Sequence, residues 1–271
     1  MPDNELKFNN DDGFAFEQIG GSTDEVTQQN TSEGGGVDRP TMNLVFLLDT
    51  SGSMGFNGGQ RISQLNTAMP IALSAARDAA MEQETDLFVR IISFNNSASW
   101  VMGSMEKGVP VEDAYNSWRD LSPTGSTDTA GAIRLARTAM RTAYMGTNNY
   151  HPVVILITDG LSNDPSETRK AIEELREALS GGNPNKKDKV WRFAIGVEGY
   201  NEPELLDFAM IGKKEDEFGN EQEGVPMVFK VDNVADLTKV LKNVTVSSLL
   251  SVAQAGTGDG STEEEGPIIP I

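Results

Sequence analysis

Apolar residues follow two different spacings along residues 41–254. Short, nearly continuous apolar runs predict strands that are buried on both faces. These runs cover residues 43–48, 87–94, 99–102, 153–158, 190–197 and 226–231. Apolar residues at helical spacing predict helices over residues 61–83, 111–119, 128–144, 165–180, 202–210 and 233–253. Because strands and helices alternate, we predict an α/β fold with a doubly wound, mostly parallel six-stranded sheet and helices on both faces.

Three local features modify this pattern. Asn95 and Asn96 separate two predicted strands, which indicates a hairpin and makes residues 99–102 a short antiparallel edge strand. Pro70 falls inside the helix predicted over residues 61–83, where we expect it to kink or split the helix. Residues 213–224 are rich in charge and predict a loop or a hairpin.

The two ends of the chain differ in composition from the part between them. Residues 1–40 hold nine acidic and two basic residues, and they include a run of three glycines. Residues 255–271 hold four acidic residues and no basic residue, and they finish in an apolar Pro-Ile-Ile-Pro-Ile run. We therefore expect an acidic, flexible segment over residues 1–40, one folded domain over residues 41–254, and an acidic, flexible tail over residues 255–271.

The overall charge excludes some classes of partner. The chain has 271 residues, with 41 Asp and Glu against 22 Lys and Arg, and a formal net charge of −19. Binding to nucleic acid or to an anionic membrane needs a basic surface, so the charge argues against both. The sequence shows no apolar run long enough to span a membrane and no signal-peptide pattern at its start. The absence of cysteine excludes thiolate metal sites and favours a cytoplasmic location.

Polar motifs follow two of the predicted strands, and a third lies between them in a loop that opens a helix. Residues 49–53 read Asp-Thr-Ser-Gly-Ser, residues 124–129 read Thr-Gly-Ser-Thr-Asp-Thr, and residues 159–160 read Asp-Gly. Ligands of a doubly wound fold bind where parallel strands end, so we expect these motifs to meet at one edge of the sheet. Carboxylate and hydroxyl oxygens are hard donors, which suit Mg²⁺ or Mn²⁺ rather than Zn²⁺. The candidate ligands are Asp49, Ser51, Ser53, Thr127 and Asp159.

Four neighbouring residues are candidates for the rim of this site. Asp128 is expected either to be a negative charge at a helix N-terminus, where the helix dipole favours it, or to support a ligand from behind. Ser162 follows the second strand-end motif and is expected either to line the rim or to belong to a helix start. Met54 and Phe56 lie in a glycine-rich stretch beside the site, where they either form an exposed apolar surface for a partner or fold back onto the domain.

Residues 42–250 resemble a von Willebrand factor A (VWA) domain, because the three motifs match its metal-ion-dependent adhesion site in type, order and spacing. The resemblance implies that Ser51, Ser53 and Thr127 offer hydroxyls to the metal. It also implies that Asp49 and Asp159 bind the metal directly or through water. In this family, an Asp or Glu of a partner protein then completes the shell of the cation. Gly-Ser-Thr at residues 125–127 replaces the commoner Gly-Gly-Thr and keeps the threonine.

Within the family, the chain is most similar to bacterial TerY-type proteins in residues 47–54, 92–94 and 194–197. The resemblance implies a Mg²⁺-dependent protein-interaction module, an adaptor or scaffold, in a bacterial stress-response, tellurite-resistance or phage-defence complex. The implied partners are a kinase, a phosphatase or an ATPase encoded nearby. One alternative is a structural or regulatory subunit of a larger machine, for example one that contains a MoxR-like AAA+ ATPase. Another is a metal-dependent hydrolase.

Sequence patterns argue against an enzyme. The chain has no Gly-Lys-Ser/Thr phosphate loop, no Gly-x-Gly-x-x-Gly motif after a strand and no Gly-x-Ser-x-Gly elbow. His151 is the only histidine, and it precedes a strand at the edge opposite the candidate site. The two acidic ends also allow self-association: Glu263–Glu265 or the terminal carboxylate could bind the metal of a neighbouring copy or mask the site in cis. Solubilising linkers, or segments that dock another protein, are the simpler interpretation of these ends.

Overall fold

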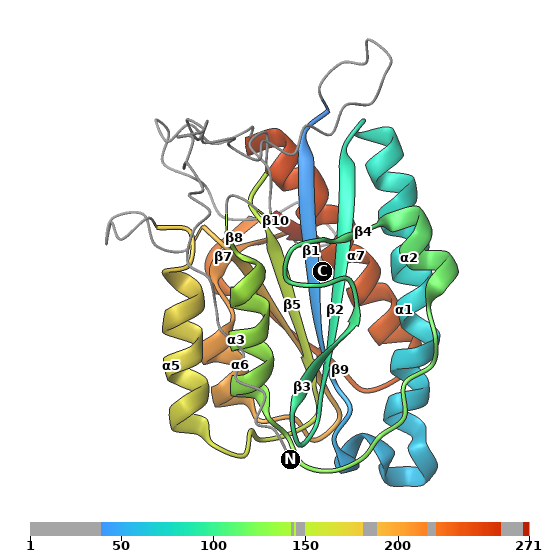
Figure 1. Cartoon of the computed structure of the whole chain (residues 1–271), viewed down its shortest axis with the longest axis vertical. Coiled ribbons are helices and arrows are strands. Elements are labelled where there is room, and N and C mark those ends of the chain that lie inside the picture. The colour runs from blue at the N-terminus through green and yellow to red at the C-terminus, as the bar shows by residue number, and fades with distance from the viewer. Residues whose placement is uncertain are drawn as a thin grey trace, which may run out of the picture. The chain divides into compact units, whose positions relative to one another are not determined.

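The computed structural model describes residues 39–141, 144, 150–180, 189–215, 221–255 and 268–270. The expected N-terminal segment therefore lies outside the described residues, apart from its last two. Along the rest of the chain, strands and helices alternate as the apolar spacing predicts (Figure 1). No helix in the described ranges is both long enough and apolar enough to cross a membrane.

The main sheet has six strands along its path in the order β3-β2-β1-β5-β6-β9. The path strands are β1 (Thr41–Asp49), β2 (Asp86–Phe94), β3 (Ala98–Met102), β5 (Val153–Thr158), β6 (Trp191–Val197) and β9 (Val228–Val231). β1, β2, β5, β6 and β9 are parallel, and β3 is antiparallel to β2 at the edge. The predicted doubly wound sheet and its antiparallel edge strand are thus confirmed. A two-residue strand that we did not predict, β4 (Val109–Pro110), also pairs with β2.

Helices cover both faces of the sheet (Figure 1). The long helices α1 (Phe56–Glu82) and α7 (Val234–Ala255) pack against each other on one face, with the short α2 (Val111–Ser117) beside α1. The helices α3 (Thr129–Ala139), α5 (Pro165–Arg176) and α6 (Glu202–Phe208) lie on the other. β1 is buried from Met42 to Asp49, as its continuous apolar sequence requires. The central strand that carries the first motif is therefore fixed on both sides.

α1 differs from its prediction in two respects. It begins at Phe56 rather than at residue 61, directly after a short 3-10 helix, η1 (Gly52–Gly55). It also continues through Pro70, so the expectation of a split is wrong. Proline removes one backbone hydrogen bond, but the 27-residue helix continues past it and packs against α7.

A second, smaller sheet was not predicted in full. β7 (Ile211–Glu215) and β8 (Glu221–Pro226) form an antiparallel hairpin, which agrees with one of the two expectations for residues 213–224. β10 (Ile268–Pro270) pairs in parallel with β7, with Ile268 beside Lys213. These three residues, which we expected in a flexible tail, instead belong to a sheet of the domain. Residues 256–267 lie outside the described part of the chain.

Candidate metal site

Asp49 ends β1 and lies at the centre of the candidate site. The register that pairs Leu48 with Ile157 brings Asp49 beside Thr158, the last residue of β5. Thr158 donates its hydroxyl to Asp49 Oδ2 at 2.6 Å, and the backbone amide of Ser51 donates to Asp49 Oδ1 at 2.7 Å. The Asp49 side chain has no exposed surface. Two neutral donors therefore hold a fully buried carboxylate at the carboxyl edge of the sheet.

The environment of Asp49 disfavours its negative charge. Burial raises the pKa of the Asp49 carboxyl above its ordinary value of 3.8, and the nearby charge of Asp159 raises it further. The donated hydrogen bonds act in the opposite direction but are the smaller effect. No Lys or Arg in the described ranges forms an ion pair with Asp49. A bound cation would supply the missing positive charge.

Two serines connect Asp49 to the second carboxylate. The hydroxyl oxygens of Ser51 and Ser53 are 2.9 Å apart, and Ser53 donates its hydroxyl to Asp159 Oδ1 at 2.7 Å. Ser51 and Asp159 are buried, whereas Ser53 is half-buried. Four of the five candidate ligands thus form one continuous hydrogen-bonded cluster, drawn from the ends of two neighbouring strands.

The loop that carries Thr127 is held against the first motif by backbone hydrogen bonds. The amide of Gly52 donates to Gly125 O at 2.9 Å, and the amide of Thr124 donates to Thr50 O at 2.8 Å. Gly125 has a φ of +73°, a left-handed conformation that favours glycine. An added Cβ at Gly52 would lie 3.1 Å from Gly125 O, so small residues permit this close approach.

Thr127 itself is positioned by the loop that follows β5. Its backbone amide donates to Asn163 Oδ1 at 3.0 Å, and its carbonyl accepts from the amide of Asn163 at 2.9 Å. Thr127 is buried, and its hydroxyl takes part in no hydrogen bond within the described ranges. The structure therefore places the fifth candidate ligand in a loop that is hydrogen-bonded to the segment of the first motif. The hydroxyl oxygen of Thr127 is available as a ligand of a cation.

The donor set fits a hard divalent cation. Two carboxylates and three hydroxyls supply oxygen alone, the donor type that Mg²⁺ and Mn²⁺ prefer. In the described part of the chain, no three His, Cys, Asp or Glu residues gather as a metal-binding group. A cation at this edge would therefore depend on the hydroxyls of Ser51, Ser53 and Thr127 as well as on the two carboxylates. Asp49 and Asp159 would supply the negative charge.

The four rim candidates fall into different roles. Asp128 caps α3, since its Oδ1 accepts from the amide of Gly131 at 2.9 Å, so it lies at the helix N-terminus as one of the two expectations required. Met54 is fully buried, whereas 62% of Phe56 is exposed, so the two residues do not form an exposed pair. The two lie in different elements: Met54 belongs to η1, and Phe56 is the first residue of α1.

Ser162 is bound to an acidic residue that the sequence did not single out. Its amide donates to Glu204 Oε2 at 3.0 Å, and its hydroxyl donates to Glu204 Oε1 at 2.9 Å. Ser162 is buried, so these two bonds fix the chain three residues after Asp159. The nearby α5 begins with Asp164 as its cap.

Arg61 is the most consequential residue that the sequence analysis missed. Its Nη1 donates to Asp159 Oδ2 at 2.6 Å, so a guanidinium group pairs with one of the two carboxylates. Asn96 and Glu204 were missed as well, although they hold the loops of the site. The one available signal for Arg61 was a basic residue within the first turns of the helix that follows the Ser53 motif.

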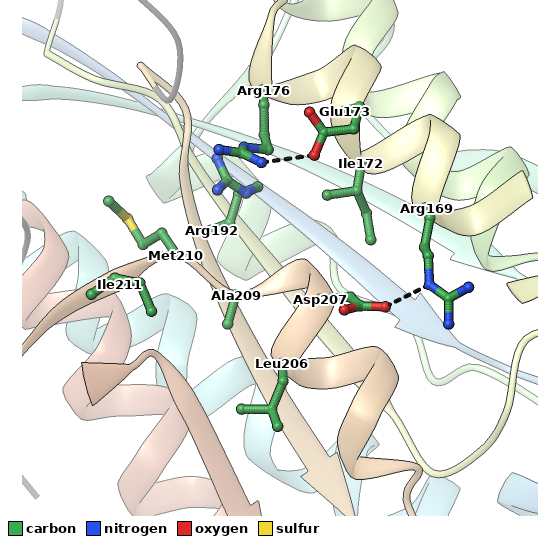
Figure 2. Close-up of a pocket in the computed structure, with 10 residues that line it drawn as sticks. All are labelled: Arg169, Ile172, Glu173, Arg176, Arg192, Leu206, Asp207, Ala209, Met210 and Ile211. Atoms are coloured by element: carbon green, nitrogen blue, oxygen red, sulfur yellow. Dashed lines mark hydrogen bonds and ion pairs between the residues drawn. The ribbon is translucent and has the colours of Figure 1, made fainter. Parts of the chain in front are cut away.

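A cavity of about 630 Å³ lies elsewhere, among residues of α5, β6, α6 and β7 (Figure 2). Arg169 pairs with Asp207 at 2.9 Å, and Arg176 pairs with Glu173 at 2.7 Å. The buried Arg192 donates to the carbonyl of Phe208. None of the candidate ligands lines this cavity, and its described charges are largely paired.

Comparison with known proteins identifies the family. The sequence profile of the von Willebrand factor type A domain matches residues 43–243, which is well over half of the chain. The chain therefore belongs to the VWA family, a family of metal-dependent protein-interaction modules. The family resemblance and the fold inferred from the sequence are both confirmed.

Individual relatives are distant and mostly much longer. The chain is 25% identical over 178 residues to the mouse collagen alpha-5(VI) chain, covering 64% of this chain and 6% of the relative. It resembles a VWA protein from Catenulispora acidiphila with 19% identity and a TM-score of 0.55, covering 78% and 43% of the two chains. It also resembles proximal thread matrix protein 1 of the mussel byssus, with 16% identity and a TM-score of 0.56, covering 78% of this chain and 48% of that protein. The metal-ion-dependent adhesion site (MIDAS) motif of that protein is occupied by zinc. The chain thus spans less than half the length of each of these relatives.

Proposed function

We propose that the domain binds a protein partner through a divalent cation held by Asp49, Ser51, Ser53, Thr127 and Asp159. The observation that carries this proposal is the buried carboxylate of Asp49, which has no cationic partner in the described ranges and is linked by two serines to Asp159. When bound, the cation supplies an electropositive centre that can accept a carboxylate from an Asp or Glu of the partner. The protein residues hold the cation and orient its open side.

We further propose that Mg²⁺ or Mn²⁺ is the cation. The oxygen-only donor set supports this choice, because Zn²⁺ is more often held by nitrogen and sulfur. The zinc in the MIDAS motif of the mussel protein supports a divalent cation in general, without selecting one.

We propose a binding role without catalysis. A hydrolase at this site would need a general base beside the metal. His151 precedes β5 at the opposite edge of the sheet, where its Nδ1 lies 2.8 Å from Lys189 O. Asp128 is engaged as a helix cap. These placements support an interaction module over the alternative of a metal-dependent hydrolase.

The biological setting rests on the sequence resemblance. We propose a TerY-type adaptor or scaffold in a bacterial stress-response, tellurite-resistance or phage-defence complex, with a kinase, a phosphatase or an ATPase encoded nearby as partner. A structural subunit of a larger machine is the alternative. The cytoplasmic location and self-association through the acidic ends stay predictions from the sequence.

Two measurements test the proposal. Isothermal titration of metal-free protein with Mn²⁺ should show one site in the wild type and none in an Asp49→Ala, Ser51→Ala double variant. Asp164→Asn is a matched control, because Asn caps a helix about as well as Asp and the residue lies outside the site. Capture of the native partner should then require metal and be lost with EDTA. Capture by the double variant at the wild-type level would contradict metal-dependent binding.

A further inference from the structure

Arg61 is mostly buried beside the proposed metal site and is hydrogen-bonded to two of its residues. Its Nη1 donates to Asp159 Oδ2 at 2.6 Å and to the carbonyl of Ser53 at 3.3 Å. Only 12% of its side chain is exposed, and the Asp159 side chain has no exposed surface. Gly199, with a φ of +90°, lets the turn after β6 approach the guanidinium: an added Cβ there would lie 3.3 Å from Arg61 Nη2.

The two oxygens of Asp159 face different partners. Oδ1 accepts from the Ser53 hydroxyl, which belongs to the proposed ligand cluster, and Oδ2 accepts from Arg61. A cation held by this cluster would bind through the oxygen that faces the Ser53 hydroxyl, because Arg61 already holds the other oxygen. Arg61 acts on the cation through the carboxylate and through space, and it does not donate an atom to it.

We infer that Arg61 sets the charge of the loaded site, so that it weakens cation binding and strengthens binding of an acidic ligand. This inference rests on the proposed function. The charges of Asp49 and Asp159 cancel one divalent cation, and the guanidinium then leaves a positive excess. Glu198 offsets this excess only in part, because its Oε2 is 3.8 Å from Arg61 Nε and 49% of its side chain is exposed to solvent.

The size of the effect follows from Coulomb's law. The carboxylate would lie between the guanidinium and the proposed cation, which corresponds to a charge separation on the order of 6 Å for use in Coulomb's law. Even with the dielectric constant of bulk water, a single and a double charge at that distance change a binding constant about tenfold. Arg61 is therefore a positioning and specificity residue with two opposed effects. A purely structural role would weaken both binding steps together.

Arg61→Gln tests the inference, with Arg61→Lys as the control that keeps the charge. Mn²⁺ affinity is measured by isothermal titration of metal-free protein. Acid binding is then measured at saturating Mn²⁺ by fluorescence anisotropy, with a labelled peptide that carries one Glu and the same peptide with Gln. We expect Arg61→Gln to bind Mn²⁺ about tenfold more tightly and the Glu peptide several-fold more weakly. Arg61→Lys should stay within about threefold of the wild type in both assays.

Glu198→Gln provides a second variant with the opposite expected signs: weaker Mn²⁺ binding and tighter binding of the Glu peptide. It keeps the test decisive if Arg61→Gln does not fold. Unchanged or jointly weakened affinities in the folded variants would overturn the role of Arg61 and leave the proposed function standing. A wild type that binds no Mn²⁺, or that does not distinguish the Glu from the Gln peptide when loaded, would overturn the proposed function and this inference together.

Discussion

Asp49→Asn should stabilise the metal-free domain and abolish its response to metal. Asn keeps the shape of the side chain and removes the charge. The side-chain carbonyl oxygen of the Asn can still accept from Ser51 N. The Thr158 hydroxyl can turn so that its oxygen accepts from the side-chain NH₂ group of the Asn. The substitution therefore changes the charge of a fully buried group while leaving its packing in place.

The magnitude follows from the surroundings of Asp49. A buried charged group without a paired opposite charge costs at least about 1–3 kcal/mol, and the variant recovers that cost. For a domain of this size, each kcal/mol corresponds to about 2–4 °C in Tm. Metal at 100 times its Kd stabilises the wild type by about 2.7 kcal/mol, whereas a variant that has lost a charged ligand should gain almost nothing.

The pH dependence gives an independent check with a defined sign. The pKa of Asp49 is raised in the folded state above its ordinary value of 3.8. The folded state therefore holds this proton more tightly than the unfolded chain, and the stability from Asp49 is fully present below that value. That contribution is lost as the pH rises through the raised pKa. The stability advantage of Asp49→Asn should thus be largest near neutral pH and disappear in acid.

Urea unfolding at several pH values, with EDTA or with Mg²⁺, measures all three effects. Asp164→Asn serves as the control, because it makes the same change from Asp to Asn at an exposed helix cap. This variant should respond to metal like the wild type. Lower stability of metal-free Asp49→Asn at neutral pH would refute the reasoning about an uncompensated buried charge. A wild-type response to Mg²⁺ in this variant would remove Asp49 from the ligand set.

Two further substitutions test the loops that frame the site. Gly125→Ala should cost at least about 1 kcal/mol more than Gly224→Ala in urea unfolding and weaken Mn²⁺ binding. Both glycines have φ near +70°, but an alanine Cβ at Gly125 would meet an asparagine side chain at 2.6 Å, whereas nothing lies within 4 Å at Gly224. Glu204→Ala should cost about 1–2 kcal/mol, because it removes the acceptor of both Ser162 hydrogen bonds. Glu202→Ala, which removes an exposed ion pair in the same helix turn, should cost less than about 0.5 kcal/mol. Equal costs within the glycine pair of variants, or within the glutamate pair, would contradict these assignments.

The positions of the candidate ligands could be predicted because they depend on chain direction alone. In a parallel sheet the carboxyl ends of neighbouring strands share one edge, so residues after two buried strands meet there. The register between β1 and β5 then places Asp49 beside Thr158, and Asp159 follows directly. The continuous apolar runs predicted the strands, and the polar motifs were then located by their positions directly after those strands.

The supporting residues could not be predicted because they depend on how loops pack together. Asn163 binds Thr127 across 36 positions of sequence, and Glu204 binds Ser162 across 42. Single Asn and Glu residues in loops and helix starts carry no spacing that reveals such pairings. β10 was missed for a related reason, since three residues after a glycine-rich, acidic stretch show too little periodicity to predict a strand.

The two carboxylates of the site are compensated differently, and this difference links folding to binding. Asp159 has a guanidinium partner within the domain, so its charge is satisfied without metal. Asp49 has only neutral donors in the described ranges, so its charge is the one that a cation relieves. The metal-free domain can therefore fold with one carboxylate neutralised from within. The stabilisation gained from metal then arises mainly at Asp49, which is why the substitution of that one residue separates the stability of the fold from its response to the cation.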